Sequence, residues 1–168
     1  GPLKKYVETI QPDVVGITSF TISLIDVIEA ARNIRSALPS THLCLGGHHP
    51  IAFPIEAARL EEFDSVVVGE GEIAFTELVT ALANGEDISD IQGVYTKSSV
   101  ENWVNKEFKR DKRFLQHVTL PPAYIEDINT LPPPNRQFID HINYQSIVGV
   151  SSKLATILSS RGCPYKCT

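Results

Sequence analysis

The chain has 168 residues, of which 42% are hydrophobic and 21% are charged, and its formal net charge is -5 at pH 7. This composition is typical of a globular protein with a sizeable core, and the negative charge argues against a nucleic-acid or anionic-membrane partner. No apolar run approaches the about 20 residues that a membrane-spanning helix needs and no signal peptide is recognisable, so we expect a cytoplasmic protein.

The beginning of the chain predicts a fragment of a longer protein. Methionine is absent, and Gly1-Pro2 resembles the remnant of a protease cleavage. An amphipathic helix over 3–10 follows directly, with no strand before it. We therefore interpret the chain as excised from a longer one.

Apolar runs and helical periods alternate along the first half of the chain. A buried strand is predicted at 14–18, followed by a helix that begins at Ser23, with Ser23 and Asp26 as a capping box, and ends near Leu38. The next expected elements are a strand at 42–45, a helix at 51–60, a strand at 65–68 and a helix at 72–83. This alternation predicts an α/β fold with parallel strands and helices on both faces of the sheet.

Three of the predicted strands end in short loops that are polar or rich in glycine. Ligands of open α/β sheets bind beyond the carboxyl ends of the strands, so we expect these loops to form one binding rim. The pair Gly46-Gly47 lacks two Cβ atoms and allows a close approach of backbone or of a bulky ligand. The candidate binding residues in the three loops are Ser19, Phe20, Thr21, Ser23, Gly46, Gly47, His48, His49, Gly69, Glu70, Gly71 and Glu72.

The pattern changes after Gly85. Residues 91–95 are consistent with an edge strand, and 99–152 are expected to be a connector with the stiff, proline-rich stretches 121–122 and 131–134. Five basic residues lie in 106–113 beside two acidic ones. A nucleic-acid patch is one interpretation of this run, but we favour a solvated connector.

The last segment, 153–168, is expected to begin a second domain. A strand-like run at 154–158 precedes a loop in which Cys163 and Cys167 are separated by three residues. Two thiolates at this spacing can ligate a metal from one short loop. On spacing alone, a pair of incidental cysteines or half of a zinc site remains open, whereas three cysteines do not indicate a disulfide framework.

The motif Ser-Arg-Gly-Cys-Pro-Tyr-x-Cys at 160–167 resembles the opening of the radical S-adenosylmethionine signature, Cys-x3-Cys-x2-Cys. The upstream sequence resembles the cobalamin-binding domain that precedes the radical barrel in one large subgroup of that family. The resemblance covers essentially the whole chain, through Pro-Asp-Val-Val-Gly-Ile-Thr-Ser (12–19), Gly-Gly-His-His-Pro (46–50), Val-Val-Gly-Glu-Gly-Glu (67–72), Ile-Gln-Gly-Val (91–94) and Leu-Pro-Pro-Pro (131–134).

This resemblance implies a domain organisation. Residues 1–98 are expected to form a Rossmann-like (flavodoxin-like) cobalamin-binding domain that lacks its first strand, and 99–152 the connector. Residues 153–168 are then the irregular extension that begins the radical barrel. An orphaned strand at 154–158 needs a partner, so we expect a dimer or strand swap through an exposed sheet edge.

The resemblance also implies cofactors: cobalamin at the rim and, in the full-length parent, a [4Fe–4S] cluster with S-adenosylmethionine. Cys163 and Cys167 resemble the first two cluster ligands, and the third falls at position 170, beyond Thr168. We therefore expect the parent to be a methyltransferase or another radical-based modification enzyme. The fragment itself is expected to hold no stable cluster and to be catalytically inactive.

Individual rim residues carry different expectations. Gly46 and Gly47 leave room for the cobalamin, and the hydroxyls at 19, 21 and 23 suit its amide-rich periphery. The carboxylates of Glu70 and Glu72 either belong to the site or only favour the amino end of a helix.

The two adjacent histidines could also ligate a metal. The Asp-x-His-x-x-Gly pattern of histidine-ligated cobalamin proteins is absent from the sequence, so His48 and His49 are interpreted as rim residues rather than cobalt ligands. A zinc site with Cys44 is disfavoured because that cysteine is expected to be a buried strand residue.

Two other function classes are compatible with an α/β fold. The first is a degenerate domain of the same fold that binds no cobalamin and serves as a docking or assembly platform. The second, a phosphoacceptor receiver, needs carboxylates clustered at strand ends, whereas Asp13 and Asp64 both open their strands.

Overall fold

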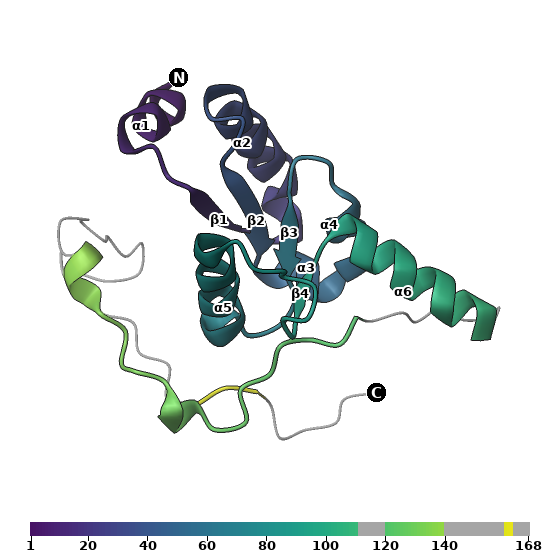
Figure 1. Ribbon diagram of the computed structural model, residues 1–168. Helices are drawn as coiled ribbons and strands as arrows, with labels where there is room; N and C mark the ends of the chain where they lie inside the picture. The colour runs from purple at the N-terminus through teal and green to yellow at the C-terminus, as the bar shows by residue number, and fades with distance from the viewer. Residues whose placement is uncertain (111–119, 140–159, 163–168) are drawn as a thin grey trace. The chain divides into compact units, whose positions relative to one another are not determined.

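The structure is a computed structural model that describes residues 1–110, 120–139 and 160–162 (Figure 1). The chain divides into two compact units, Gly1–Ile128 and Asn129–Thr168. The elements in chain order are α1 (Pro2–Ile10), β1 (Val14–Thr18), η1 (Thr21–Ser23), α2 (Leu24–Ala37), β2 (His42–Gly46), α3 (His48–Ala52), α4 (Pro54–Arg59), β3 (Ser65–Val67), α5 (Gly71–Asn84), β4 (Val94–Tyr95), α6 (Lys97–Arg110), η3 (Ile128–Thr130) and η4 (Arg136–Ile139). No helix in these described ranges is long and apolar enough to span a bilayer.

The first unit is built on a four-stranded sheet in the order β1-β2-β3-β4. β1 and β2 are parallel and pair from Val14 with His42 to Thr18 with Gly46, and β2 and β3 are also parallel. β4 is antiparallel to β3 and forms the edge strand expected near 91–95, in a shorter form. The α/β prediction is therefore confirmed.

The two faces of the sheet contact different helices. One cluster joins the alternating residues 43, 45, 66 and 68 of β2 and the β3 region to buried side chains of α1, α2, α4 and α6. Cys44 and Val67, which point the other way, lie in a second cluster with Ala74 and Leu78 of α5. This alternation places helices on both faces of the sheet, as the sequence predicted.

Three local expectations differ from the structure. The strand predicted to be buried, β1, has only intermediate or exposed residues because it lies at the edge of the sheet. The single helix predicted at 51–60 is two short helices, because the residue before a proline disfavours helical backbone and Phe53 adopts φ -132° and ψ 61° before Pro54. The capping box of Ser23 and Asp26 was wrong. The Ser23 hydroxyl instead accepts a hydrogen bond from the Phe20 N–H at 3.2 Å and donates to the Phe20 carbonyl at 3.1 Å, which closes η1.

The first unit also extends beyond residue 98, where we expected the connector to begin. Helix α6 contributes the fully buried Val100, and its amino end carries a reciprocal pair of bonds between Thr96 and Ser99. Residues 120–125, which we call the strap, bury Leu120 and Ile125. The strand predicted at 154–158, Cys163 and Cys167 lie outside the described residues.

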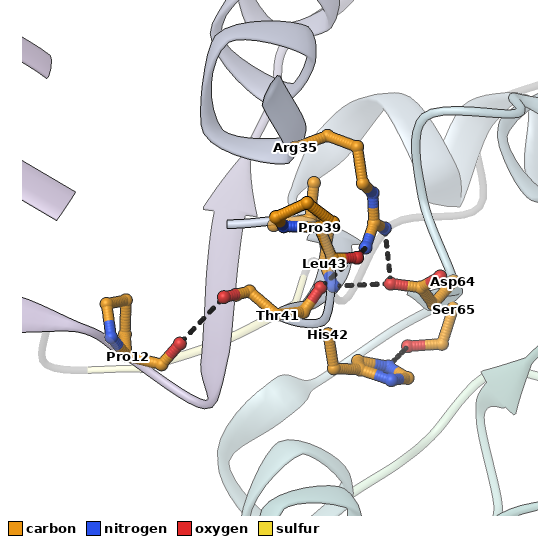
Figure 2. Close-up of polar contacts among 8 residues, drawn as sticks. All are labelled: Pro12, Arg35, Pro39, Thr41, His42, Leu43, Asp64 and Ser65. Atoms are coloured by element: carbon orange, nitrogen blue, oxygen red, sulfur yellow. Dashed lines mark hydrogen bonds and ion pairs between the residues drawn. The ribbon is translucent and has the colours of Figure 1, made fainter. Parts of the chain in front are cut away.

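Polar side chains close the amino ends of β2 and β3 (Figure 2). The Asp64 carboxylate forms an ion pair with Arg35 of α2 at 2.6 Å and accepts the backbone N–H of Leu43 at 2.7 Å. The same guanidinium donates to the carbonyl of Thr41 at 2.7 Å and to that of Pro39 at 3.0 Å. These bonds tie α2 to the start of two neighbouring strands.

Two further contacts complete this end of the sheet (Figure 2). The Thr41 hydroxyl donates to the carbonyl of Pro12 at 2.8 Å, which joins the start of β2 to the chain entering β1. The His42 ring lies 2.8 Å from the Ser65 hydroxyl, atom Nε2 to Oγ, across β2 and β3. Burial lowers the pKa of His42 below its ordinary value, so the neutral ring is favoured.

Candidate functional site

The opposite end of the same strands holds a cavity. Its volume is about 510 Å³, within the range typical of small-molecule and cofactor sites. The residues that line it come from β1, β2, β3 and the first turns of α5: Gly16, Ile17, Thr18, Cys44, Gly46, Gly47, Val67, Gly69, Gly71, Glu72 and Phe75. The carboxyl ends of three parallel strands thus meet at one open space, where the sequence predicted a binding rim.

Four predicted rim glycines line this cavity, but they do so for different reasons. Gly47 has φ +92° and Gly69 has φ +102°, and a Cβ at either one would overlap backbone atoms of a neighbouring segment. Gly46 has no such constraint, since a Cβ built there meets no atom within 4 Å. A Cβ at Gly71 meets only Val67, at an ordinary 3.9 Å. A side chain at position 46 or 71 is thus compatible with the fold itself.

The hydroxyl groups of residues 19–23, which follow β1 and which we call the β1 loop, contact other groups of the protein itself. Ser19 is buried and donates to the Phe20 carbonyl at 2.9 Å, and Ser23 holds both backbone groups of the same residue. Thr21 is exposed and its Oγ1 lies 3.2 Å from Nδ1 of His49. None of these four predicted residues, 19, 20, 21 and 23, lines the cavity.

The two predicted rim histidines have different environments. His48 is exposed and stacks on Phe20, with ring centroids 4.8 Å apart. His49 is only 1% exposed, and its ring packs against Phe53 with centroids 5.5 Å apart. Its Nε2 is buried with no hydrogen-bond partner among the described residues. His48 therefore lies at the surface beside the β1 loop, whereas His49 lies beneath it.

The two carboxylates of the third loop also differ. Glu70 accepts the backbone N–H of Ile125 at 2.6 Å through Oε2, so it contacts the strap. Glu72 lines the cavity and lies in the first turn of α5, where the helix dipole favours a negative charge. The loop thus contacts both the strap and the cavity.

Sequence reasoning missed several cavity residues, among them Gly16, Cys44, Val67 and Phe75. A signal for the strand residues was present, since a glycine between apolar strand residues marks a close approach. Here the ring of Phe75 approaches that glycine closely, and a Cβ at Gly16 would lie 2.9 Å from its Cζ. Period-two alternation then places positions 16 and 18 on the α5 face, as it does Cys44.

Cys44 is buried at the base of the cavity, and burial raises the pKa of its thiol to about 11. The thiol is therefore protonated at neutral pH and is a poor nucleophile or metal ligand. No group of three or more His, Cys, Asp or Glu side chains that could hold a metal occurs within the described ranges. The two cysteines expected to bind metal lie outside those ranges.

Comparison with known families gives a match over the first part of the chain. Residues 3–79 match the family described as the B12 binding domain. This stretch includes β1 to β3 and every predicted residue of the rim. The resemblance to a cobalamin-binding domain is therefore confirmed for the N-terminal part.

Curated relatives cover most of the chain at low identity. An uncharacterised methyltransferase of Pyrococcus horikoshii is 28% identical over 98% of this chain and 32% of its own length. The anaerobic magnesium-protoporphyrin IX monomethyl ester cyclase of Rubrivivax gelatinosus is 25% identical over 99% of this chain and 28% of its own length. The hopanoid C-3 methylase of Methylococcus capsulatus is 25% identical over 96% and 28%. The chain thus spans about a third or less of these relatives.

Proposed function

We propose that this B12 binding domain holds cobalamin in the cavity at the carboxyl ends of β1, β2 and β3. The observation that carries the proposal is Gly46, which lines the cavity although neither its backbone conformation nor any neighbouring atom excludes a side chain. A bulky ligand explains the missing Cβ, because a side chain at this position would project into the space that the ligand fills.

The other walls suit part of a large cofactor with an amide-rich periphery. Thr18 supplies a hydroxyl, Glu72 a carboxylate beside the backbone N–H groups at the start of α5, and Phe75 an apolar wall. When bound, cobalamin supplies a cobalt centre that can carry a methyl group. The residues of this chain bind and orient it.

For the longer protein, we propose a cobalamin-dependent radical S-adenosylmethionine enzyme that transfers a methyl group or carries out another radical-based modification. Two observations support this proposal: the relatives include proteins named as a methyltransferase and a methylase, and the loop at 160–167 resembles the opening of the radical signature. Cys163 and Cys167 are the proposed ligands of its iron–sulfur cluster.

Titration of the purified chain with hydroxocobalamin, followed by absorption and by calorimetry, tests the binding proposal. We expect saturable binding near one equivalent. Gly46→Val, which places a β-branched side chain at a strand end, should weaken binding by about tenfold or more and leave thermal stability nearly unchanged. An equal dissociation constant for the two proteins, or no saturable binding by the folded wild type, contradicts the proposal.

The alternative function is a platform of this fold that binds no cobalamin. Exposed apolar side chains at the β1 loop and the first turn of α2 favour a protein partner, since Ile22 is 96% exposed, Ile25 75% and Phe20 55%. Two results together support this alternative: the folded wild-type chain does not bind cobalamin, and Ile22→Ser weakens the association of the chain with the rest of the longer protein.

The cluster proposal has its own test. Anaerobic reconstitution of the longer protein should give the absorption and spin-resonance spectra of a [4Fe–4S] cluster, and Cys163→Ala or Cys167→Ala should abolish them. The matched control is Cys44→Ala, which removes a buried thiol of high pKa and should leave the spectra unchanged. A cluster that survives both substitutions contradicts the proposed ligands.

A further inference from the structure

The strap, residues 120–125, runs beside the end of β3 as a short parallel partner. The N–H of Ala123 donates to the Val68 carbonyl at 2.7 Å, and the N–H of Glu70 donates to the Ala123 carbonyl at 3.0 Å. Gly69 and Ala123 form a parallel bridge between these two bonds. The strap therefore continues the sheet at the residues that lead into the third cavity loop.

Two glycines permit this approach. Gly93, with φ +81°, would bring a Cβ to 2.5 Å from the Cβ of Ala123, and a Cβ at Gly69 would overlap the carbonyl oxygen of the same residue. Both glycines have positive φ and face one alanine, so a side chain at either position is incompatible with the strap. The strap thus explains why Gly69 is glycine without any ligand.

Side chains fasten the strap at both of its ends. The Glu70 carboxylate accepts the N–H of Ile125 at 2.6 Å, a charge-assisted bond to a buried residue. The Tyr95 hydroxyl donates to the Pro121 carbonyl at 2.6 Å. Ile125 leads within a few residues to Asn129, where the second compact unit begins.

We infer that Glu70 is a positioning residue that couples the docking of the strap to the shape of the cavity. This inference rests on the proposed cobalamin site. Within the loop 69–72, Glu70 holds the strap through its backbone N–H and its carboxylate. Gly69 lies against Ala123 of the strap and also lines the cavity, together with Gly71 and Glu72. Displacement of the strap releases Gly69 and Glu70 and thereby loosens the part of the cavity wall that Gly69, Gly71 and Glu72 form.

Thermodynamic linkage makes this coupling reciprocal. If the docked strap favours the cavity shape that binds cobalamin, bound cobalamin must favour the docked strap by the same factor. Because the chain runs from the strap into the second unit, occupancy of the cavity is thereby transmitted to the segment that enters that unit.

Amide hydrogen exchange of the full chain, with and without hydroxocobalamin, tests the inference on the wild type and three variants. Glu70→Gln retains an acceptor oxygen but loses the charge, Glu70→Ala loses both, and Glu126→Gln removes the same charge from an exposed neighbour of Ile125. In ligand-free protein we expect faster exchange of the amides of Ile125 and Gly71 in the first two variants, with the larger effect in Glu70→Ala. Glu126→Gln should match the wild type.

Cobalamin affinity shows whether Glu70 positions the cavity wall or only stabilises the fold. We expect Glu70→Gln to weaken cobalamin binding about three- to tenfold at nearly unchanged midpoint of thermal unfolding, and cobalamin to slow exchange of the Ile125 amide in the wild type. The inference is overturned if amide exchange in Glu70→Ala equals that of the wild type. It is also overturned if Glu70→Gln binds cobalamin with the dissociation constant of the wild type. If the wild type binds no cobalamin, the proposed function fails, and exchange at Gly71 in the ligand-free variants still decides whether Glu70 holds the loop.

Discussion

The two ends of the β-sheet in the first unit are built in opposite ways. At the amino ends, the side chains of Arg35, Thr41 and Asp64 bond to backbone groups, and Arg35 and Asp64 also form an ion pair (Figure 2). At the carboxyl ends, glycines of the same strands and their loops surround a cavity of about 510 Å³. Strand β2 shows the contrast within five residues. It begins at His42, whose ring contacts the Ser65 hydroxyl, and ends at Gly46, where a Cβ would meet no atom within 4 Å.

This difference teaches where stability and binding come from in this fold. A cavity at one end removes packing contacts that would otherwise stabilise the strands. Partly buried side-chain to backbone bonds at the other end contribute stability without occupying the ligand space. Substitutions at the amino end are therefore expected to change unfolding, and those at the carboxyl end to change binding, except where a glycine supports the backbone.

Gly47→Ala has the largest expected effect, and it is the exception to this comparison because it lies at the carboxyl end but should change stability. Gly47 lies at φ +92° and ψ -165°, a region that is essentially restricted to glycine, and its Cβ would overlap the Thr18 hydroxyl and lie 2.8 Å from the N atom of Ser19. We expect the free energy of unfolding to fall by about 3 kcal/mol and cobalamin binding to weaken with it. Chemical denaturation and titration measure both, and stability equal to that of Gly46→Ala contradicts the structural role.

Asp64→Ala tests the amino end. It removes the acceptor of the Leu43 N–H and the partner of Arg35, so a backbone donor within the sheet loses its bond. Because the carboxylate is partly exposed, we expect a loss of about 2 kcal/mol in the free energy of unfolding with an unchanged dissociation constant for cobalamin.

The matched control for Asp64→Ala is Glu61→Ala, whose carboxylate is 85% exposed and pairs with Lys97 at 3.4 Å. We expect its stability to lie within about 0.5 kcal/mol of the wild type. Equal effects of the two substitutions, or weaker cobalamin binding by Asp64→Ala, contradict the separation of the two ends.

The sequence predicted the sheet well because its strands are short apolar runs between strong turn signals. The strands expected at 14–18, 42–45 and 65–68 each lie within one residue of the observed ends. Helix α6 was missed, since only Val100, Trp103 and Val104 pack on the core in an otherwise polar stretch. Thr96 and Ser99 were the local signal for its start.

The sequence predicted the location of the site but not the role of each residue in it. The sequence identified the loops that meet at the carboxyl ends, and five of their residues line the cavity: Gly46, Gly47, Gly69, Gly71 and Glu72. It did not separate a glycine required by a neighbouring backbone, such as Gly69, from one that leaves open space, such as Gly46. That distinction depends on the strap, whose contact with β3 joins residues far apart in sequence.

Thr41→Val has a smaller expected effect and sharpens the comparison. Valine has nearly the shape of threonine but cannot donate to the Pro12 carbonyl, which lies 2.8 Å from the Thr41 hydroxyl. We expect the free energy of unfolding to fall by about 1 kcal/mol, with no change in cobalamin affinity. Gly46→Val should have the opposite pattern, with weaker cobalamin binding and nearly unchanged stability. If either substitution changes both the free energy of unfolding and the cobalamin affinity, the comparison of the two ends is contradicted.

The pH dependence of stability at the amino end is the smallest expected effect. Burial lowers the pKa of His42 below 6.5, Asp64 opposes this change and Arg35 adds to it. As pH falls through about 6.5, the unfolded chain therefore binds a proton before the native protein does, and the native state loses stability until the native pKa is passed. The contribution of His42 is thus complete above pH 6.5 and is lost below it.

Chemical denaturation between pH 7.5 and 5 compares the wild type with His42→Asn, which keeps a polar group beside Ser65 but does not titrate in this range. Carboxylates present in both proteins cancel in the difference between the two curves. We expect the wild type to lose stability more steeply as pH falls from about 7 to about 5. Parallel curves exclude His42 as the titrating group, whereas a wild type that gains stability relative to the variant in acid requires a protonated ring in the native contact with Ser65.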